Sequence, residues 1–457
     1  MSASQKRHLT QPYSAYSRGE LPAEDAEITR VERGSPCGEY LRRFWQPVCL
    51  AAELGDLPRK VRMFGEDLVA FRAKAGAVGL LEPHCSHRGT SLEFGICEAN
   101  GLRCCYHGWL YGVDGRVLET PGDPPESPLR FEVCHGAYPA LEYKGIVFGY
   151  FGPPEKKPEF PVYDSYELAG DRLAPYYITY PCNWLQVHEN VMDPAHGVFL
   201  HTRISFTQFA DAWGELPVME FVPTPAGMIY VTSRRWGDNV WVRSNDILLP
   251  NLAQVGHIWE DGTEPKAFSR VAITRWTTPV DDRTCRIIGW RHFHPDADPR
   301  GIADESKCGA ESVDFYGQNG ARTYDERQRI PGDYDAQTSQ RPIAIHALEN
   351  LTVCDSGVAM LRKLLRAELR RVAKGEDPKL SGVRSNGLVP TYTHDTVVRV
   401  PPRSGAAAED DKTLVRDVGR RITEIVVRGE HHGAPDRPER IRAMIRAYEQ
   451  AERGALV

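Results

Sequence analysis

The sequence predicts an α+β fold, in which antiparallel sheets carry helices on their outside. Residues 45–155 are typical of short β-strands separated by turns, and residues 216–294 of several longer strands. Residues 356–374 form an amphipathic helix, and residues 437–453 form another near the end of the chain. A chain of 457 residues is too long to fold around one ordinary hydrophobic core, so we expect two domains or one elaborated domain.

The first β-rich region contains two hairpin signals. One is the Gly-Glu-Asp turn at residues 65–67, and the other is the Asp114-Gly115 pair, whose glycine tolerates positive φ. A proline-rich stretch, residues 152–164, then indicates a linker. Residues 180–201 are predicted to be helical.

The second half contains longer elements. Strands are predicted over residues 227–236, 239–249, 269–279 and 284–295. Residues 300–330 are polar and are expected to form a loop or a short helix. The helix over residues 356–374 has apolar side chains at the 3.6-residue period, namely Val358, Leu361, Leu365, Leu369 and Val372.

Composition excludes several classes of function. The net charge of −6 lacks the basic excess of nucleic-acid-binding proteins. No apolar run approaches the roughly 20 residues that span a bilayer, and the first residues lack the apolar stretch of a secretory signal. We therefore expect a cytoplasmic protein with no membrane or nucleic-acid partner. In that reducing compartment its eleven cysteines are not expected to form a disulfide framework.

Two short segments combine cysteine with histidine. PHCSHRG contains Cys85 and His87, and RCCYHGW contains Cys104 and His107. A Rieske-type [2Fe–2S] cluster needs two cysteines on one iron and two histidines on the other, and each segment supplies one of each. Zinc also accepts two cysteines and two histidines, but zinc fingers usually pair cysteine with cysteine in a C-x₂₋₄-C knuckle. The spacing C-x-H-x₁₆-C-x-x-H resembles the Rieske signature.

The residues next to these ligands have expected roles too. Gly89 and Gly108 follow the histidines and allow the backbone to bend close to the cluster. Cys105 does not fit the C-x-x-H spacing, and we expect it to be a packing residue.

A second candidate site lies in NWLQVHENVMDPAHGVFLH, which contains Glu189, Asp193, His196 and His201. Two histidines and one carboxylate leave coordination positions open on a non-heme iron, as oxygenases require. Histidines at i and i+5 lie about 140° apart on a regular helix. They converge only if the helix widens or ends between them, which Gly197 permits. Taken alone, core histidines are the commoner interpretation of such a pair.

The segment resembles the E-x₃-D-x₂-H-x₄-H iron motif of the α subunits of Rieske oxygenases. The resemblance implies that His196 and His201 bind iron, and that Asp193 links an iron histidine to a cluster histidine of the neighbouring subunit. His188 has no place in the motif and is expected to be structural. The motif is preceded by residues that often accompany it, Asn183, Trp184 and Gln186.

The third ligand is expected further along the chain. Segment 331–340, PGDYDAQTSQ, resembles the C-terminal region of the phthalate-dioxygenase-like group, in which Asp333 matches the ligand aspartate. Asp335 and Asp355 are the competitors, although Asp355 is better placed to cap the helix that begins near Ser356.

The resemblance covers residues 40 to 375 and implies two domains. These are a Rieske domain over residues 45–155 and a catalytic iron domain formed by residues 1–44 and 156–457. The implied enzyme is a mono- or dioxygenase of the EC 1.14 class. It hydroxylates or demethylates a small aromatic, carboxylated substrate with O₂ at a mononuclear Fe(II). The implied assembly is a head-to-tail homotrimer.

The remaining expected partners are inferred from cofactor motifs that the sequence lacks, and two alternative functions stay open. No GxGxxG or flavin motif is evident, so electrons are expected from a separate NAD(P)H-dependent reductase, with or without a ferredoxin. One alternative is a Rieske electron-transfer protein with an inactive second domain. Another is a zinc-containing regulatory or binding protein. The sequence leaves the identity of the substrate open.

Overall fold

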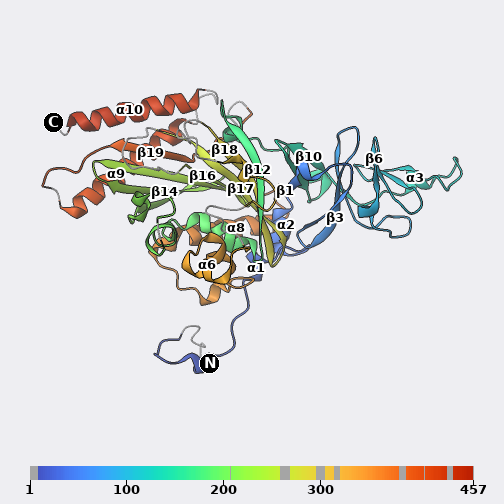
Figure 1. The fold of residues 1–457 in the computed structure, drawn as a ribbon, viewed down its shortest axis with the longest axis horizontal. Helices are drawn as coiled ribbons and strands as arrows, with labels where there is room; N and C mark the ends of the chain where they lie inside the picture. Colours follow the sequence, from blue (N-terminus) through green and yellow to red (C-terminus); the bar gives the residue numbers. More distant parts are fainter. Residues whose placement is uncertain are drawn as a thin grey trace.

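The computed structural model describes the chain over residues 9–205, 207–257, 268–294, 304–312, 320–379, 387–405, 407–429 and 436–455. The molecule is elongated, with small sheets at one end and a large sheet covered by helices at the other (Figure 1). The predicted α+β class is therefore confirmed. No helix within these ranges is long and apolar enough to cross a membrane.

Three small antiparallel sheets form the β-rich end. The first contains β1 (Trp45–Leu50), β11 (Ile146–Tyr150) and β10 (Ala140–Tyr143). The second runs through β2 (Arg59–Met63), β3 (Glu66–Arg72), β4 (Val78–Leu81) and β9 (Ala137–Tyr138). The third runs through β5 (Ile96–Cys97), β6 (Gly101–Arg103), β7 (Leu110–Gly112) and β8 (Val117–Glu119). Both predicted hairpins are present, with φ of 80° at Gly65 and 83° at Gly115.

The large sheet contains eight antiparallel strands and includes all four of the longer predicted ones. Its order is β12 (Arg172–Tyr180), β18 (Thr284–Phe293), β17 (Val271–Asp281), β16 (Leu252–Gly256), β15 (Asn239–Leu248), β14 (Gly227–Trp236) and β13 (Val218–Thr224). The eighth strand, β19 (His394–Arg399), pairs with the first half of β15.

Helices cover both faces of the large sheet, because its strands bury alternate side chains on opposite sides. Along β14, Met228 and Tyr230 share a core with α8 (Ser356–Ala373), whereas Ile229 and Val231 share a core with α9 (Ala408–Arg428). Figure 1 shows α10 on one side of the sheet and α8 on the other, and α9 shares a core with α10. The remaining helices are α1 (Ala26–Thr29), α2 (Pro36–Leu41), α3 (Leu129–Glu132), α4 (Trp184–Glu189), α5 (His196–Val198), α6 (Tyr324–Arg329), α7 (Asp333–Thr338) and α10 (Arg437–Ala455).

The N-terminal helices α1 and α2 lie against α8, although the whole β-rich end separates them in sequence. Arg366 of α8 forms ion pairs with Asp25 and Glu27 at the start of α1. The Asn183 side chain donates to the Thr29 carbonyl over 2.9 Å. The N-terminal segment therefore packs with the helices of the large sheet.

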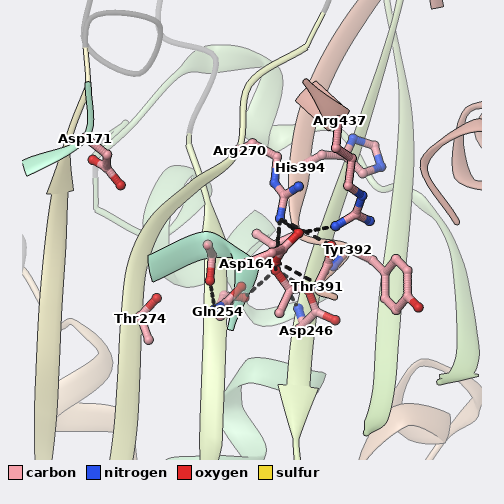
Figure 2. Close-up of polar contacts among 12 residues, drawn as sticks. Asp164, Asp171, Asp246, Gln254, Arg270, Thr274, Thr391, Tyr392, His394 and Arg437 are labelled. Carbon is pink, nitrogen blue, oxygen red and sulfur yellow. Dashed lines mark hydrogen bonds and ion pairs between the residues drawn. The ribbon is translucent and has the colours of Figure 1, made fainter. Parts of the chain in front are cut away.

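A buried charged cluster joins the end of the predicted linker to the large sheet and to α10 (Figure 2). Asp164 is ion-paired with Arg437, at the start of α10, and with Arg270, 3.3 Å away. It also accepts the backbone N–H of Thr391 over 3.0 Å. Arg270 and Arg437 hold the pKa of this carboxyl below its ordinary value despite the opposing effect of burial. Breaking such a buried pair would leave an uncompensated charge, so the cluster fixes the position of α10.

Asp246 of β15 lies in the same cluster, directly opposite Gln254 of β16. Its Oδ2 accepts the backbone N–H of Tyr392 over 2.8 Å and the hydroxyl of Thr393 over 2.7 Å. Its Oδ1 and the Gln254 Oε1 are both buried, and neither has a hydrogen-bond partner in the described part of the chain. Burial raises the pKa of Asp246 to about 6.

This raised pKa predicts a pH-dependent stability. Between about pH 4 and pH 6 the folded protein holds a proton on Asp246 that the unfolded chain has released, so stability falls as the pH rises through this window. Near neutral pH the ionised carboxylate costs about 3 kcal/mol. Asp246→Asn, whose amide can donate to Gln254, is expected to raise the thermal unfolding midpoint near neutral pH. Its advantage should shrink at about pH 4.5, where wild-type Asp246 is protonated.

The matched control is Asp417→Asn, because Asp417 is exposed on α9 and the same charge is removed there. Unfolding curves of both variants, recorded at the two pH values, separate the local effect of Asp246 from the change in net charge. Equal midpoints for wild type and Asp246→Asn near neutral pH would contradict the prediction.

Candidate active site

The two Cys-His segments form loops of matching backbone geometry. Cys85 follows β4 and Cys104 follows β6. In each loop the glycine four residues after the cysteine donates its N–H to the cysteine carbonyl, over 2.8 Å for Gly89 and 3.1 Å for Gly108. These glycines have φ of 77° and 74°, a region that side chains other than glycine rarely adopt. The glycines therefore bend both loops, as predicted.

The side chains of the loops are arranged as a Rieske cluster requires. The thiols of Cys85 and Cys104 are buried, while the rings of His87 and His107 are exposed and lie with centroids 4.5 Å apart. Burial raises the pKa of the Cys104 thiol. Two thiols on the inner side and two imidazoles on the outer side would give each iron of such a cluster a pair of like ligands. Trp109 stacks on the His87 ring at 4.9 Å and orients it.

A single zinc ion fits these loops less well. Among the described residues, a group of three or more potential metal ligands whose atoms all lie within 4.8 Å of one another occurs elsewhere, at His196, His201 and Asp333. All four potential ligands of the Cys-His loops are described, and no three of their ligand atoms lie that close together, as the ligands of a single zinc ion would. The expectation that Cys105 packs in the interior is wrong, because its side chain points into solvent at the tip of the loop.

The predicted helix over residues 180–201 is interrupted rather than continuous. Helix α4 passes into a 3₁₀ turn at Asn190–Met192, the chain leaves helical geometry before Pro194, and α5 then begins at His196. A π-helical turn follows at Phe199–Arg203. This widened turn turns His201 toward His196, with ring centroids 5.3 Å apart. Widening was one of the two ways in which histidines at i and i+5 could converge.

Asp333, the first residue of α7, completes the group. Its Oδ1 lies 3.5 Å from His196 Nε2 and 3.4 Å from His201 Nε2. Two imidazole nitrogens and one carboxylate oxygen therefore face one point, which is the donor set of a non-heme iron site. Burial opposes ionisation of Asp333, but the two histidines hold its pKa well below the ordinary value. The carboxylate is thus available as an anionic ligand.

The competing aspartates are engaged elsewhere. Asp335 is ion-paired with Arg322 and Arg327. Asp355 precedes α8, as expected, but its carboxylate accepts the N–H and the hydroxyl of Thr352 and makes no cap hydrogen bond to the helix. Its predicted capping interaction is therefore absent.

Neighbouring residues of the iron motif have distinct surroundings. His188 is fully buried, and burial lowers its pKa to about 3, in keeping with a structural role. Glu189 is also buried and forms a two-bond ion pair with Arg362, at 2.5 and 2.7 Å. Arg362 also pairs with Glu349, so these charges tie α4 to α8.

Sequence reasoning missed Asn190. Its side-chain amide donates to Asp333 Oδ1 over 3.2 Å and lies 3.3 Å from His196 Nε2. The Asn190 amide therefore places an N–H donor at the point on which the ligand atoms converge. The same ligand atoms, which accept hydrogen bonds, would surround a cation there. A lone asparagine in an irregular turn has no periodic signal that would have identified it.

Asp193 lies at the turn that precedes His196. Its Oδ1 accepts the N–H groups of Ala195 and His196 over 3.2 and 3.3 Å. The His196 Nδ1 donates to the carbonyl of Asp193, while the carboxylate Oδ2 is 3.8 Å from Nδ1. The carboxylate also lines a pocket of about 450 Å³, which His196, Asn190, Arg341 and Arg362 share. Asp193 and His196 therefore lie side by side at the edge of the pocket.

Two Cys-His loops and a converging group of two histidines and one carboxylate define the class of the Rieske non-heme iron oxygenases. A family model of the Rieske [2Fe-2S] domain matches residues 44–135. The chain is 42% identical over 433 residues to the tert-butanol monooxygenase / tert-amyl alcohol desaturase oxygenase subunit of Aquincola tertiaricarbonis, with 91% of each chain covered. It is 38% identical over 402 residues to the phenoxybenzoate dioxygenase subunit alpha of Ectopseudomonas oleovorans, with 83% of this chain and 91% of the relative covered.

The fold is shared with a solved structure of dicamba monooxygenase bound to dicamba. The TM-score is 0.56 at 16% identity, over 74% of this chain and 99% of that one. The chain therefore belongs to the oxygenase subunits of the Rieske non-heme iron oxygenases. It is an oxidoreductase whose cofactors are a Rieske [2Fe–2S] cluster and a mononuclear iron.

Proposed function

We propose that this chain is the terminal component of an oxygenase system that hydroxylates or oxidatively demethylates a small aromatic, carboxylated substrate. Electrons come from NAD(P)H through a separate reductase, with or without a ferredoxin. The observation that carries the proposal is the convergence of His196, His201 and Asp333 in a chain that also holds two Cys-His loops. A Rieske electron carrier would need only the loops, so the three-residue group favours an oxygenase over the carrier.

Each site residue has a role in this proposal. Cys85, His87, Cys104 and His107 hold the cluster. His196, His201 and Asp333 hold the iron by three ligands, which leaves positions open. When bound, the cluster supplies electrons and the iron supplies activation of O₂.

Asp193 orients the His196 ring and presents its carboxylate at the pocket, where it connects the site to a second chain of a homotrimer. A histidine of that chain's cluster would bond to the carboxylate. As a hydrogen-bond partner of two metal-bound imidazoles, it would fix their orientation.

A carboxylated substrate is favoured by one cation near the iron group. The charge of Arg275 in β17 adds to the larger effects of His201 and His196 in lowering the pKa of Asp333, and to the larger effect of burial in lowering that of His188. Its Nε is buried and has no hydrogen-bond partner among the described residues. A substrate carboxylate would compensate this cation. Phenoxybenzoate, dehydrodivanillate and phthalate are the aromatic acids in the names of three relatives.

A tertiary alcohol is the second candidate substrate, because the relative at 42% identity is named for tert-butanol and tert-amyl alcohol. Substrate-dependent O₂ uptake by the purified oxygenase with a reductase decides between the two. The panel contains aromatic acids, their methyl ethers and both alcohols. We expect the aromatic acids to give the highest turnover, and Arg275→Gln to raise KM for them more than for the alcohols. Uptake with the alcohols alone would contradict the aromatic assignment.

A substitution at Asp193 tests the connection between chains. Asp193→Asn keeps an oxygen that can accept the N–H groups of Ala195 and His196, but removes the charge. We expect both cofactors to remain bound, while oxidation of the reduced cluster by O₂ and substrate slows about 10- to 100-fold. Stopped-flow absorbance of the cluster measures this rate.

A second test uses a mixed trimer of Asp193→Asn chains and Cys85→Ser chains, with its composition verified. Each parent lacks either the connecting carboxylate or the cluster, so activity above both parents requires electrons to cross between chains. Activity no greater than the sum of the parents would contradict the head-to-tail arrangement.

A further inference from the structure

Gln208 is a fully buried polar side chain next to the iron group. It lies in the loop that follows the π-helical turn, and its backbone N–H donates to the His201 carbonyl over 2.8 Å. Its side-chain amide lies between the His201 ring and two backbone carbonyls, those of Leu200 and Pro331. Pro331 is two residues before Asp333, so one amide contacts the surroundings of two residues of the group.

The two carbonyls determine which way the amide points. Gln208 Nε2 lies 3.3 Å from the Leu200 oxygen and 3.3 Å from the Pro331 oxygen, and its two hydrogens satisfy both. The reversed amide would place Oε1 against two acceptors, with no hydrogen between them. The Gln208 Oε1 must therefore face His201 Nδ1, at 2.9 Å.

This orientation in turn determines the tautomer of His201. Because Gln208 Oε1 only accepts, His201 Nδ1 must carry the hydrogen. When a metal binds, the ring is neutral, and its Nε2, which lies 3.4 Å from Asp333 Oδ1, directs its lone pair into the group. A neutral imidazole with its lone pair directed inward is the form that binds a metal.

We infer that Gln208 is a positioning residue of the mononuclear iron site. It holds His201 in the tautomer with hydrogen on Nδ1, and it joins the His201 turn to the segment that carries Asp333. The inference rests on the proposed function, in which both residues bind iron. Such outer partners of metal-bound histidines typically change metal affinity by about 10- to 100-fold.

The test compares Gln208→Leu with Gln186→Leu, which makes the same change at a matched position. Gln186 is also buried, and its amide donates to the carbonyls of Gln337 and Arg341 over 2.8 and 3.0 Å. Its oxygen accepts the N–H of Ala344 over 2.9 Å. Gln186 thus also donates to two backbone carbonyls, but its oxygen accepts a backbone N–H where that of Gln208 accepts from the His201 ring.

Two measurements distinguish a specific effect on the position of His201 from a general loss of protein stability. The first is the Fe(II) dissociation constant, from titration of protein that retains its cluster. The second is ¹⁵N NMR of histidine-labelled, Zn(II)-loaded protein, which reports the tautomer of His201. We expect Gln208→Leu to weaken Fe(II) binding about 10- to 100-fold and to mix the His201 tautomers. Gln186→Leu should leave the tautomer unchanged and weaken Fe(II) binding much less. Equal effects of the two variants would overturn the inference.

A third variant, Gln208→Glu, separates the two contacts of the side chain. Its carboxylate accepts from His201 Nδ1 but cannot donate to Leu200 or Pro331. The His201 tautomer should therefore be retained, and a mixed tautomer in this variant would also overturn the inference. The glutamate variant also decides the question if the leucine variant fails to fold.

His201→Ala distinguishes this inference from the proposed function. If His201→Ala binds Fe(II) as tightly as wild type, the assignment of the iron ligand is wrong. If His201→Ala loses iron while Gln208→Leu behaves like Gln186→Leu, only the positioning role fails.

Discussion

Alanine at His196, His201 or Asp333 is expected to eliminate the mononuclear iron and all detectable turnover, while the visible spectrum of the cluster remains. Each variant would remove one of the three proposed ligands, and Asp333 is also the carboxylate that both histidines face, at 3.5 and 3.4 Å. Iron per chain should fall from three to two, because the cluster lies in separate loops. Metal analysis and substrate-dependent O₂ uptake measure the two losses.

The control for this experiment is Asp335→Ala. Asp335 is in the same short helix, α7, but is paired with Arg322 and Arg327 rather than with the histidines. It should retain the third iron, whatever its effect on stability. Loss of iron in Asp335→Ala or Asp355→Ala, with iron retained in Asp333→Ala, would show that the third ligand is misassigned.

Serine at Cys85 or Cys104, or alanine at His87 or His107, is expected to abolish the cluster. Wild-type protein should be red-brown and show the paramagnetic signal of a reduced Rieske centre, and these variants should lack both. Turnover should disappear as well, because electrons no longer reach the iron. We expect the buried thiols to bind one iron and the exposed imidazoles the other, so all four changes should have this result.

The control here is Cys105→Ser, which changes the neighbouring exposed cysteine and should keep a normal spectrum. A purified protein that contains zinc in place of iron, with no Rieske signal on reduction, would contradict the assignment.

The large sheet was predictable from the sequence because its strands contain many β-branched and aromatic residues and its turns are explicit. The predicted strand over residues 227–236 coincides with β14, and β15 is buried along its whole length. The helix α8 followed from the regular spacing of its apolar residues. The region of residues 180–201 was harder, since Pro194 and the π-helical turn break a pattern that still has helical composition.

The candidate site was predictable to a different extent in its two halves. The Cys-His loops are local, so their spacing alone indicates the cluster. Asp333 is far from the histidines along the chain, and no spacing connects them, so its assignment depended on resemblance. Asn190 and Gln208 were not predicted, because polar residues in irregular turns have no pattern that reports their partners. Their roles are evident only from the atoms around them.

The contact of α1 with α8 has a consequence for how the chain folds as it is synthesised. Asp25 and Glu27 pair with Arg366, a residue that emerges from the ribosome only after the entire β-rich end. The small sheets consist of contacts closer in sequence and can form first, since contacts of low sequence separation form fastest. The ion pairs of the N-terminal segment with Arg366 form only after α8 is made, whereas its contacts with α2 and α4 can form earlier. The burial of Ile28 and Val31 is therefore completed late in synthesis, when α8 packs against α1.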